Sequence, residues 1–194
     1  MKKIAVFASG SGSNFQAIID AVKAEELACE VVLLVCDKPG AYCIERAEKE
    51  GVPTLVVSPK NFSSKADYEN EILRELSAGE VDLIILAGYM RLIGETLLSA
   101  YEGRIINIHP SLLPSFPGKD AIGQAFNAKV KITGVTVHYV DEGMDTGPII
   151  AQEAVKMDED ETRESLEAKI HGVEHSLYPK VIQKLCSTDS KEEK

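Results

Sequence analysis

The 194-residue sequence predicts a single α/β domain in which helices cover both faces of a mostly parallel sheet. Up to residue 109, short apolar runs of strand length alternate with longer amphipathic or charged runs of helix length. Beyond that point, alternating polar and apolar residues predict a strand of antiparallel or edge type. No repeat or linker divides the chain. We therefore expect a Rossmann-like three-layer α/β/α fold with an antiparallel C-terminal part, formed by residues 1–186 and followed by a charged tail, 187–194.

The composition, with 44% hydrophobic and 27% charged residues, is that of an ordinary globular protein. A net charge of −10 argues against a protein held to nucleic acid by phosphate contacts. The sequence shows neither a signal-peptide pattern nor an apolar run that could cross a membrane, so we expect a cytoplasmic protein without a membrane partner. The cysteines show no CxxC spacing, and they form no metal-binding pattern with the acidic residues, which predicts buried thiols and no metal.

The first strand, residues 4–7, is wholly apolar, as in strands covered on both faces. The loop Ser9–Asn14 that follows it precedes a helix expected at 15–22 and predicts an anion site. Its small residues expose backbone N–H groups at the positive end of a helix dipole, and three serine hydroxyls add donors. Phe15 stands at the third glycine of a dinucleotide fingerprint, and no P-loop lysine follows. The alternative is a tight turn, but three serines exceed what a turn requires and favour phosphate binding.

Further strands are expected at 30–36, 53–57 and 81–86, and helices at 41–50 and 65–78. Asp37 follows the second strand at the place of a ribose-binding acid, although a turn-forming role before Pro39 explains it without a ligand. The segment Gly88–Gly94 is hydrophobic except for Arg91. It is suited to line an apolar slot for a flat ring, and packing beneath the next helix is the alternative.

The strand 105–109 carries the most informative pair of residues. Asn107 and His109 interrupt its apolar run and lie two residues apart, hence on one face. The loop Pro110–Gly118 that follows is stiffened by three prolines, and open α/β sheets bind ligands beyond the carboxyl ends of their strands. An amide beside an imidazole can stabilise a carbonyl oxygen that gains negative charge. Either residue alone would be explained as a buried polar group whose hydrogen bonds are satisfied within the core.

The C-terminal part is expected to contain a helix at 120–128, an alternating strand at 133–140 that carries His138, and a strand at 149–155. The acid-rich loop Asp141–Pro148 lacks the ligand spacing of a calcium-binding EF-hand. Residues 158–161 favour the start of a final helix, with Glu174 and His175 beside its apolar seam. That seam is expected at Leu166, Ile170, Val173, Leu177, Val181 and Leu185.

A sheet of this kind gathers the Ser-Gly loop, the segment 88–94 and the Asn107–His109 pair at one edge. The loop 141–148 can bring a carboxylate to them. Oxyanion donors, a base, a phosphate cradle and an apolar slot together predict acyl transfer between an anionic small molecule and a ring-bearing donor.

The motifs resemble the 10-formyltetrahydrofolate-dependent formyltransferases over residues 1 to about 185. The resemblance rests on Asn107-x-His109-Pro-Ser-Leu-Leu-Pro114 and on Asp145 in Asp-Thr-Gly-Pro. The Ser9–Asn14 loop and the segment 87–92 are similar to the branch of the family that formylates glycinamide ribonucleotide in purine synthesis. The resemblance implies that the formyl group of 10-formyltetrahydrofolate, a co-substrate, is transferred to the amine of glycinamide ribonucleotide without a metal.

The resemblance also assigns roles to individual residues. The catalytic set is Asn107, His109 and Asp145, with the first two stabilising the oxyanion, best with a protonated imidazole, and the third taking the amine proton through water. The ribonucleotide would be held by Gly12, Ser13, Asn14 and Glu174. The folate would be enclosed by Lys65, Met90, Arg91, Leu92, Ile93, Asn107, Val140 and Asp141. Lys65 stands where the family often has Arg, and this exchange loses bidentate geometry.

Several alternatives stay open at this point. Methionyl-tRNA formyltransferases share the Asn-His-Asp set but need an added basic domain, and this chain is acidic. Formyltetrahydrofolate hydrolases share the set behind a regulatory domain not present here, and a nucleotide-sugar formyltransferase would not need the Ser-Gly loop. A nucleotide-binding module without catalysis would leave the Asn-His-Asp set without a role. The expected partners are small-molecule substrates, and the oligomeric state stays undetermined.

Overall fold

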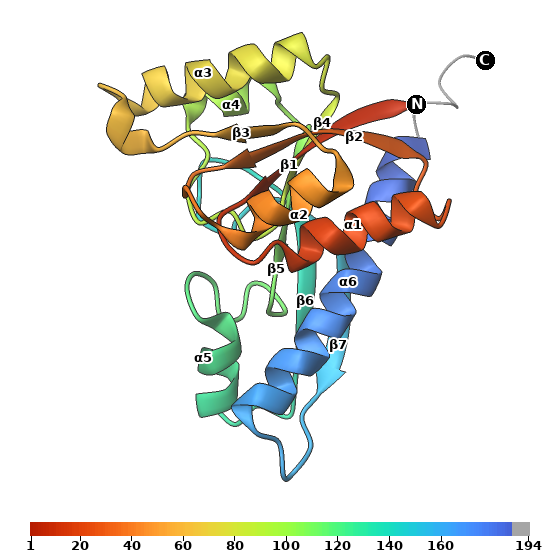
Figure 1. Cartoon of the computed structure of the whole chain (residues 1–194). Coiled ribbons are helices and arrows are strands. Elements are labelled where there is room, and N and C mark those ends of the chain that lie inside the picture. The colour runs from red at the N-terminus through yellow and green to blue at the C-terminus, as the bar shows by residue number, and fades with distance from the viewer. Residues whose placement is uncertain (188–194) are drawn as a thin grey trace, which may run out of the picture.

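The protein, described for residues 1–187 by a computed structural model, consists of a seven-stranded sheet between two layers of helices (Figure 1). The strands follow the order β3-β2-β1-β4-β5-β6-β7. They are β1 (Lys2–Ala8), β2 (Cys29–Cys36), β3 (Thr54–Val56), β4 (Leu83–Leu86), β5 (Ile105–His109), β6 (Ile132–Tyr139) and β7 (Ile149–Lys156). β1 to β5 pair in parallel, whereas β6 and β7 are antiparallel. The predicted mostly parallel sheet with an antiparallel C-terminal part is confirmed.

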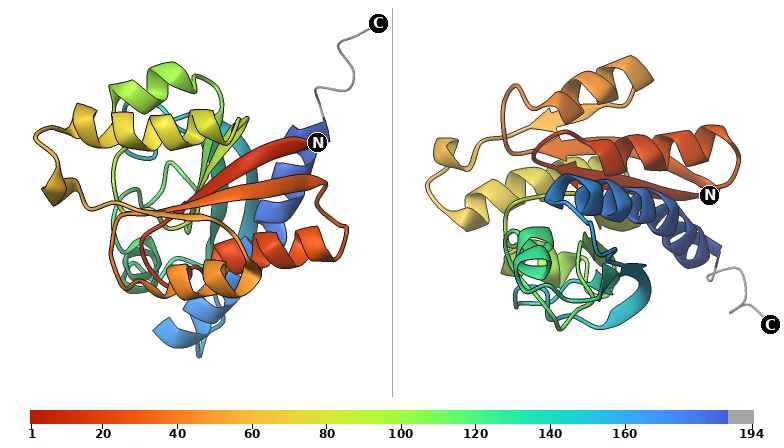
Figure 2. Two further views of the ribbon diagram at one scale, coloured as in Figure 1. Left: turned by 45° about the horizontal axis from the view of Figure 1, so that its top comes forward. Right: turned by 90° about the horizontal axis from the view of Figure 1, so that it is seen from below.

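The helices divide between the two faces of the sheet. They are α1 (Ser13–Lys23), α2 (Tyr42–Glu50), α3 (Lys65–Ala78), α4 (Glu95–Ala100), α5 (Ala121–Asn127) and α6 (Arg163–Ser187), with a 3-10 turn η1 at Pro59–Asn61. α3 and α4 cover one face, and α1, α2 and α6 cover the other (Figures 1 and 2). β1 serves both cores because its side chains alternate: Ile4 and Val6 enter one, and Ala5 and Phe7 enter the other.

Local signals place the end of α2 and the start of α3 where the sequence predicts them, whereas α6 begins at Arg163, after the start expected at 158–161. Gly51 follows the last residue of α2 and has a φ of 69°, in the left-handed region that glycine adopts easily. α3 begins at Lys65, and the Ser64 hydroxyl caps it by accepting the Asp67 N–H at 3.0 Å.

Of the two types expected for the strand that carries His138, β6 is antiparallel and is not an edge strand, since β5 and β7 flank it and β7 forms the edge. The final helix differs from the prediction. In α6, Glu174 and Tyr178 are buried, whereas the expected seam residues Val173 and Leu177 are only partly buried. The Tyr178 hydroxyl lies 2.8 Å from the Leu86 carbonyl and 3.2 Å from that of Ile106, so its polar end is satisfied inside.

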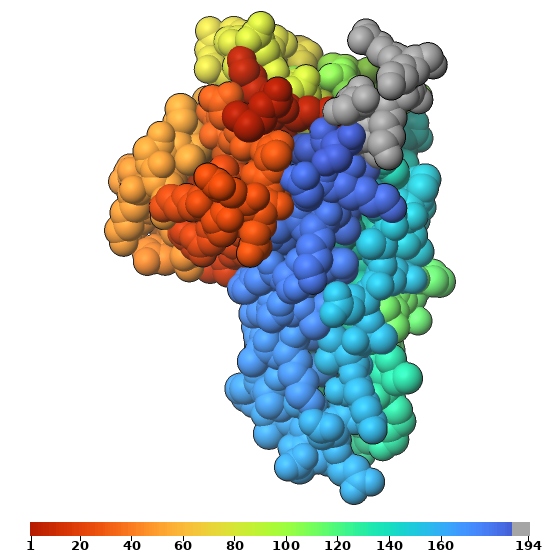
Figure 3. Space-filling model, turned by 90° about the vertical axis from the view of Figure 1, so that its right-hand side faces the viewer, coloured from red at the N-terminus to blue at the C-terminus, as the bar shows by residue number. Residues whose placement is uncertain are grey.

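α6 lies on the surface between α1 and the C-terminal strands (Figure 3). Its last residue is Ser187, and the rest of the predicted tail, 188–194, lies outside the described residues. None of the helices in the described part is both long and apolar enough to span a membrane.

The strand order creates the place for a ligand. β1 pairs with β2 on one side and with β4 on the other, so the connections after β1 and β4 leave in opposite directions. A crevice opens beyond the carboxyl ends of such strands, at the point where the winding reverses.

Candidate active site

A cavity of about 470 Å³ lies beyond the carboxyl ends of β1, β4 and β5. Segments from across the sequence line it. They are residues 10–14, 86–93, 107–110 and 118–122, residues of β6 and the loop after it, and one face of α6. The segments selected from the sequence therefore meet in one cavity.

The Ser-Gly loop places the N-terminus of α1 at the cavity, and none of the described side chains caps the first turn of this helix. Gly12 precedes α1 with a φ of 72°. A Cβ on Gly12 would lie 2.6 Å from Cys43 Cβ, so both the conformation and the contact require glycine. The uncapped N–H groups are available to an anion.

Ser9 and Asp37 have structural roles that differ from the sequence interpretation. Ser9 is buried, and its hydroxyl donates to Asp37 Oδ1 at 2.5 Å, so it is no phosphate donor. Asp37 is buried as well and accepts from Arg91 Nε at 2.7 Å, so it is more than a turn former. The Ser9 oxygen also accepts the Met90 N–H at 2.9 Å. Asp37 thereby ties the Ser-Gly loop to the segment after β4.

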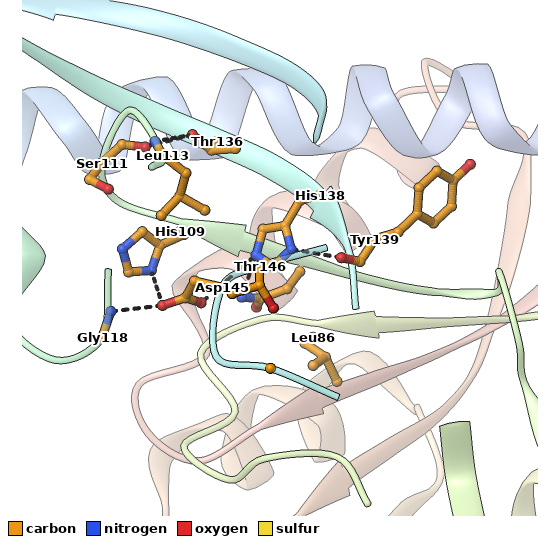
Figure 4. Close-up of polar contacts among 12 residues, drawn as sticks. Leu86, His109, Ser111, Leu113, Gly118, Thr136, His138, Tyr139, Asp145 and Thr146 are labelled. Carbon is orange, nitrogen blue, oxygen red and sulfur yellow. Dashed lines mark hydrogen bonds and ion pairs between the residues drawn. The ribbon is translucent and has the colours of Figure 1, made fainter. Parts of the chain in front are cut away.

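A cluster of polar side chains lies at the end of β5. Asn107 and His109 share one face of this strand. Asp145 approaches His109 from the loop after β6 (Figure 4). Asp145 Oδ2 lies 3.5 Å from His109 Nδ1 and accepts the Gly118 N–H at 2.8 Å. The carboxylate thus lies beside the imidazole and is fixed by a backbone donor.

His138 completes the cluster and was not selected from the sequence. It pairs with Asn107 across β5 and β6, and its Nε2 lies 3.3 Å from Asn107 Nδ2 and 3.8 Å from Asp145 Oδ1. His138 Nδ1 lies 2.8 Å from the Tyr139 carbonyl, which can only accept, so Nδ1 carries the hydrogen. In the neutral ring Nε2 then accepts from Asn107, which fixes the orientation of that amide.

The backbone around Asp145 is held in an uncommon shape. Asp145 has a φ of 57°, in the left-handed region that non-glycine residues seldom adopt. Two residues on, a Cβ at Gly147 would collide with the Tyr139 carbonyl, so only glycine lets this loop lie against β6. Such strain is common at functional sites, where surrounding contacts hold it.

The segment after β4 has an inner and an outer side. Tyr89 points inward, with its hydroxyl 2.6 Å from that of Tyr68 and its ring against Phe7. Met90 and Leu92 are 63% and 50% exposed although both are apolar, and they line the cavity. This arrangement supports the predicted slot for a flat ring.

One face of α6 forms the far wall of the cavity through Arg163, Glu167, His171 and Glu174. Glu174 is only 6% exposed, and burial raises the pKa of its carboxyl to about 7, against a smaller lowering by a hydrogen bond with Asn14. No group of three or more His, Cys, Asp or Glu within residues 1–187 is arranged to hold a metal ion.

Residues 2–182 match the family described as formyl transferase. The chain belongs to the formyl transferase family. It is 59% identical, over the whole length of both chains, to phosphoribosylglycinamide formyltransferase of Bacillus subtilis (strain 168). It is also 46% identical over 188 residues to trifunctional purine biosynthetic protein adenosine-3 of Drosophila melanogaster, of which it spans 14%.

Solved structures agree with this membership. Phosphoribosylglycinamide formyltransferase from Bacillus halodurans superposes with a TM-score of 0.94 at 58% identity, covering 97% of each chain. Glycinamide ribonucleotide transformylase 1 from Geobacillus kaustophilus superposes with a TM-score of 0.93 at 66% identity, covering 95% of this chain and 98% of the Geobacillus chain.

In this formyltransferase, the residues predicted for catalysis and for the ribonucleotide all line the one cavity. Those predicted for the folate do so too, except Lys65, which is exposed at the start of α3 and is not among the described residues that line the cavity. Sequence reasoning missed His138 and His171. A signal for His171 was available, because it lies one helical turn from Glu174 on the same face.

Glu174→Gln is expected to make the formyltransferase more stable at alkaline pH. The folded-state pKa of about 7 lies above the ordinary 4.5, so the folded protein binds more protons between these values and loses stability as the pH rises through them. Glutamine does not ionise. The gain should therefore be absent below pH 4.5 and reach about 3 kcal/mol above pH 7.

Urea unfolding of both proteins at several pH values checks this expectation. Glu167→Gln, on the same face of α6 but exposed, controls for the loss of one charge. An equal stability difference for Glu174→Gln at pH 5 and pH 8 would contradict it.

Proposed function

We propose that this chain transfers the formyl group of 10-formyltetrahydrofolate to the amine of glycinamide ribonucleotide, in de novo purine biosynthesis. The products are formyl-glycinamide ribonucleotide and tetrahydrofolate. The observation that carries the proposal is one cavity that holds both an uncapped helix N-terminus and the cluster of Asn107, His109 and Asp145. The full-length identity of 59% to a phosphoribosylglycinamide formyltransferase supports the choice of acceptor.

The two substrates occupy the two ends of this cavity. The phosphate of the ribonucleotide binds the N–H groups at Gly12, Ser13 and Asn14, where the helix dipole favours an anion. Glu174 lies at the phosphate-binding end of the cavity and accepts hydrogen bonds from the hydroxyl groups of the ribose. The flat ring of the folate enters between the segment Met90–Ile93 and the residues Val140 and Asp141, which places its formyl group at the cluster.

The reaction begins when the amine nitrogen attacks the formyl carbon and the carbonyl oxygen gains negative charge. Asn107 donates to this oxygen, since its amide is already oriented by His138. His109 Nε2 donates to the Phe116 carbonyl at 2.9 Å, and Nδ1 faces Asp145. The protonated ring therefore stabilises the oxyanion mainly through its charge, because both ring nitrogens have partners in the protein.

Asp145 takes the proton that the attacking amine releases, through a water molecule. The bond between the formyl carbon and N10 then breaks, N10 receives a proton, and the oxyanion returns to a carbonyl. The folate and the ribonucleotide are substrates in this scheme. We propose the cytoplasm as the location and small molecules as the partners.

Deformylation of the folate, followed by absorbance with and without glycinamide ribonucleotide, tests the proposal. Turnover that requires the ribonucleotide is the expected result. Turnover at the same rate without it would replace the proposal by a hydrolase that uses water as the acceptor. Folate binding without any turnover would return a nucleotide-binding module to consideration.

A further inference from the structure

Two cysteines that the reaction does not use lie in contact behind the Ser-Gly loop. Cys36 is the last residue of β2, and Cys43 lies in the first turn of α2. Both are fully buried, and Cys43 Sγ donates to Cys36 Sγ at 3.6 Å. In this reduced form, Cys36 Sγ also donates to the Lys38 carbonyl at 3.3 Å.

Cys43 touches the Ser-Gly loop directly. Its backbone N–H donates to the Gly10 carbonyl at 3.0 Å. Gly12 lies so close that a Cβ there would be 2.6 Å from Cys43 Cβ and 2.9 Å from its Cα. Gly12 therefore packs directly against Cys43, and a displacement of Cys43 toward the loop would move Gly12.

Cys36 reaches the same loop through the next residue. Asp37 accepts from the buried Ser9 hydroxyl at 2.5 Å and from Arg91 at 2.7 Å. A shift at the end of β2 is thus passed to Ser9 on one side and to the segment after β4 on the other. The contact between the two sulfur atoms therefore connects the two places at which the rest of the protein holds the Ser-Gly loop, namely Cys43 and the residue after Cys36.

We propose that Cys36 and Cys43 form a redox modification site, whose oxidation to a disulfide displaces the Ser-Gly loop and weakens binding of the phosphate-bearing substrate. The inference rests on the proposed function for the identity of that substrate. A disulfide bond is about 2.05 Å long, so the sulfur atoms must approach by about 1.5 Å, which draws the end of β2 and the start of α2 together.

The chemistry needs an oxidant small enough to reach a buried thiol, and hydrogen peroxide is of that class. The Cys36 thiolate attacks one peroxide oxygen, giving a sulfenic acid and hydroxide. The Cys43 thiol then attacks the Cys36 sulfur, the S–S bond forms and water leaves. In total, two thiols lose two hydrogen atoms, and one peroxide becomes two waters.

The electrostatics favour Cys36 as the first nucleophile. The hydrogen bond from Cys43 lowers the pKa of the Cys36 thiol, which increases the fraction of thiolate that can attack peroxide. In the other cysteine pair, the hydrogen bond with Cys186 raises the pKa of Cys29.

The test uses the full chain with Cys29→Ala and Cys186→Ala, which leaves Cys36 and Cys43 as the only thiols. After hydrogen peroxide and then catalase, both thiols should be lost and the mass should fall by two hydrogen atoms. The KM for glycinamide ribonucleotide should rise about tenfold, the effect of losing one hydrogen bond to a charged group, while kcat changes little. Dithiothreitol should restore the original KM.

Further measurements keep the outcome decisive. The variant that also carries Cys43→Ala should show no change that dithiothreitol reverses. Peptide mapping of oxidised wild-type protein locates the bond even where the double variant folds poorly. The rise in melting temperature on adding inorganic phosphate, compared between reduced and oxidised protein, tests anion binding by the Ser-Gly loop without turnover.

Persistent thiols, overoxidation without a disulfide, or a disulfide that leaves both the KM and the phosphate effect unchanged would overturn the proposal. Failure of the proposed function would appear earlier, as inactivity of the untreated protein.

Discussion

Asp145→Asn is expected to lower kcat by about 10³-fold while folate affinity changes little. The amide keeps the shape of the carboxylate, and its oxygen can still accept the Gly118 N–H that holds the loop. It cannot take a proton from the attacking amine. It also removes the negative charge that lies 3.5 Å from His109.

Steady-state kinetics with both substrates and folate binding by fluorescence check this expectation. Glu142→Gln is the matched control, because it removes one carboxylate from the same loop at a position that does not line the cavity. Its kcat should remain close to that of the wild type. If Asp145→Asn retained a tenth or more of wild-type turnover, Asp145 would not be the base.

Asn107→Leu is expected to lower kcat/KM by about 10² to 10³-fold, the usual cost of removing one oxyanion donor. The side chain is half-buried in the middle of β5, and its hydrogen bond to His138 fixes the orientation of the amide. Leucine has a similar shape but offers no donor. The loss should appear mainly in kcat, because the hydrogen bond strengthens as charge develops on the oxygen.

The melting temperature separates this effect from simple unfolding. Leucine leaves His138 Nε2 without its donor, so a decrease of a few degrees is expected. Loss confined to the KM for the folate, with an unchanged kcat, would mean that Asn107 binds the ground state only.

The sequence predicts the catalytic strand well because its signal is local. Asn107 and His109 stand in an apolar run, and their spacing of two settles that they share a face. The Ser-Gly loop is equally local, since it lies between a strand and a helix that are both easily recognised. Asp145, by contrast, was selected through the family motif, because an acid-rich loop alone offers several carboxylates.

The features that sequence reasoning missed depend on pairing and packing. His138 meets Asn107 only through the register of β5 and β6, and no pattern along one strand gives that register. Asp37 looked like a turn former because its partners Ser9 and Arg91 are distant in sequence. The burial of Glu174 and Tyr178 follows from their partners Asn14, Leu86 and Ile106, which an apolar seam cannot reveal.

The order of the strands also sets a length for the acceptor. The anion-binding loop follows β1 and the reacting cluster follows β5, with only β4 between them. Two inter-strand spacings of about 4.8 Å separate the anchoring point from the reacting point by about 10 Å. The hydrogen bonds of the sheet hold this distance constant. On the proposed function, we therefore expect the protein to select acceptors by the span between their phosphate and their amine, since a shorter or longer molecule would engage one end but not both.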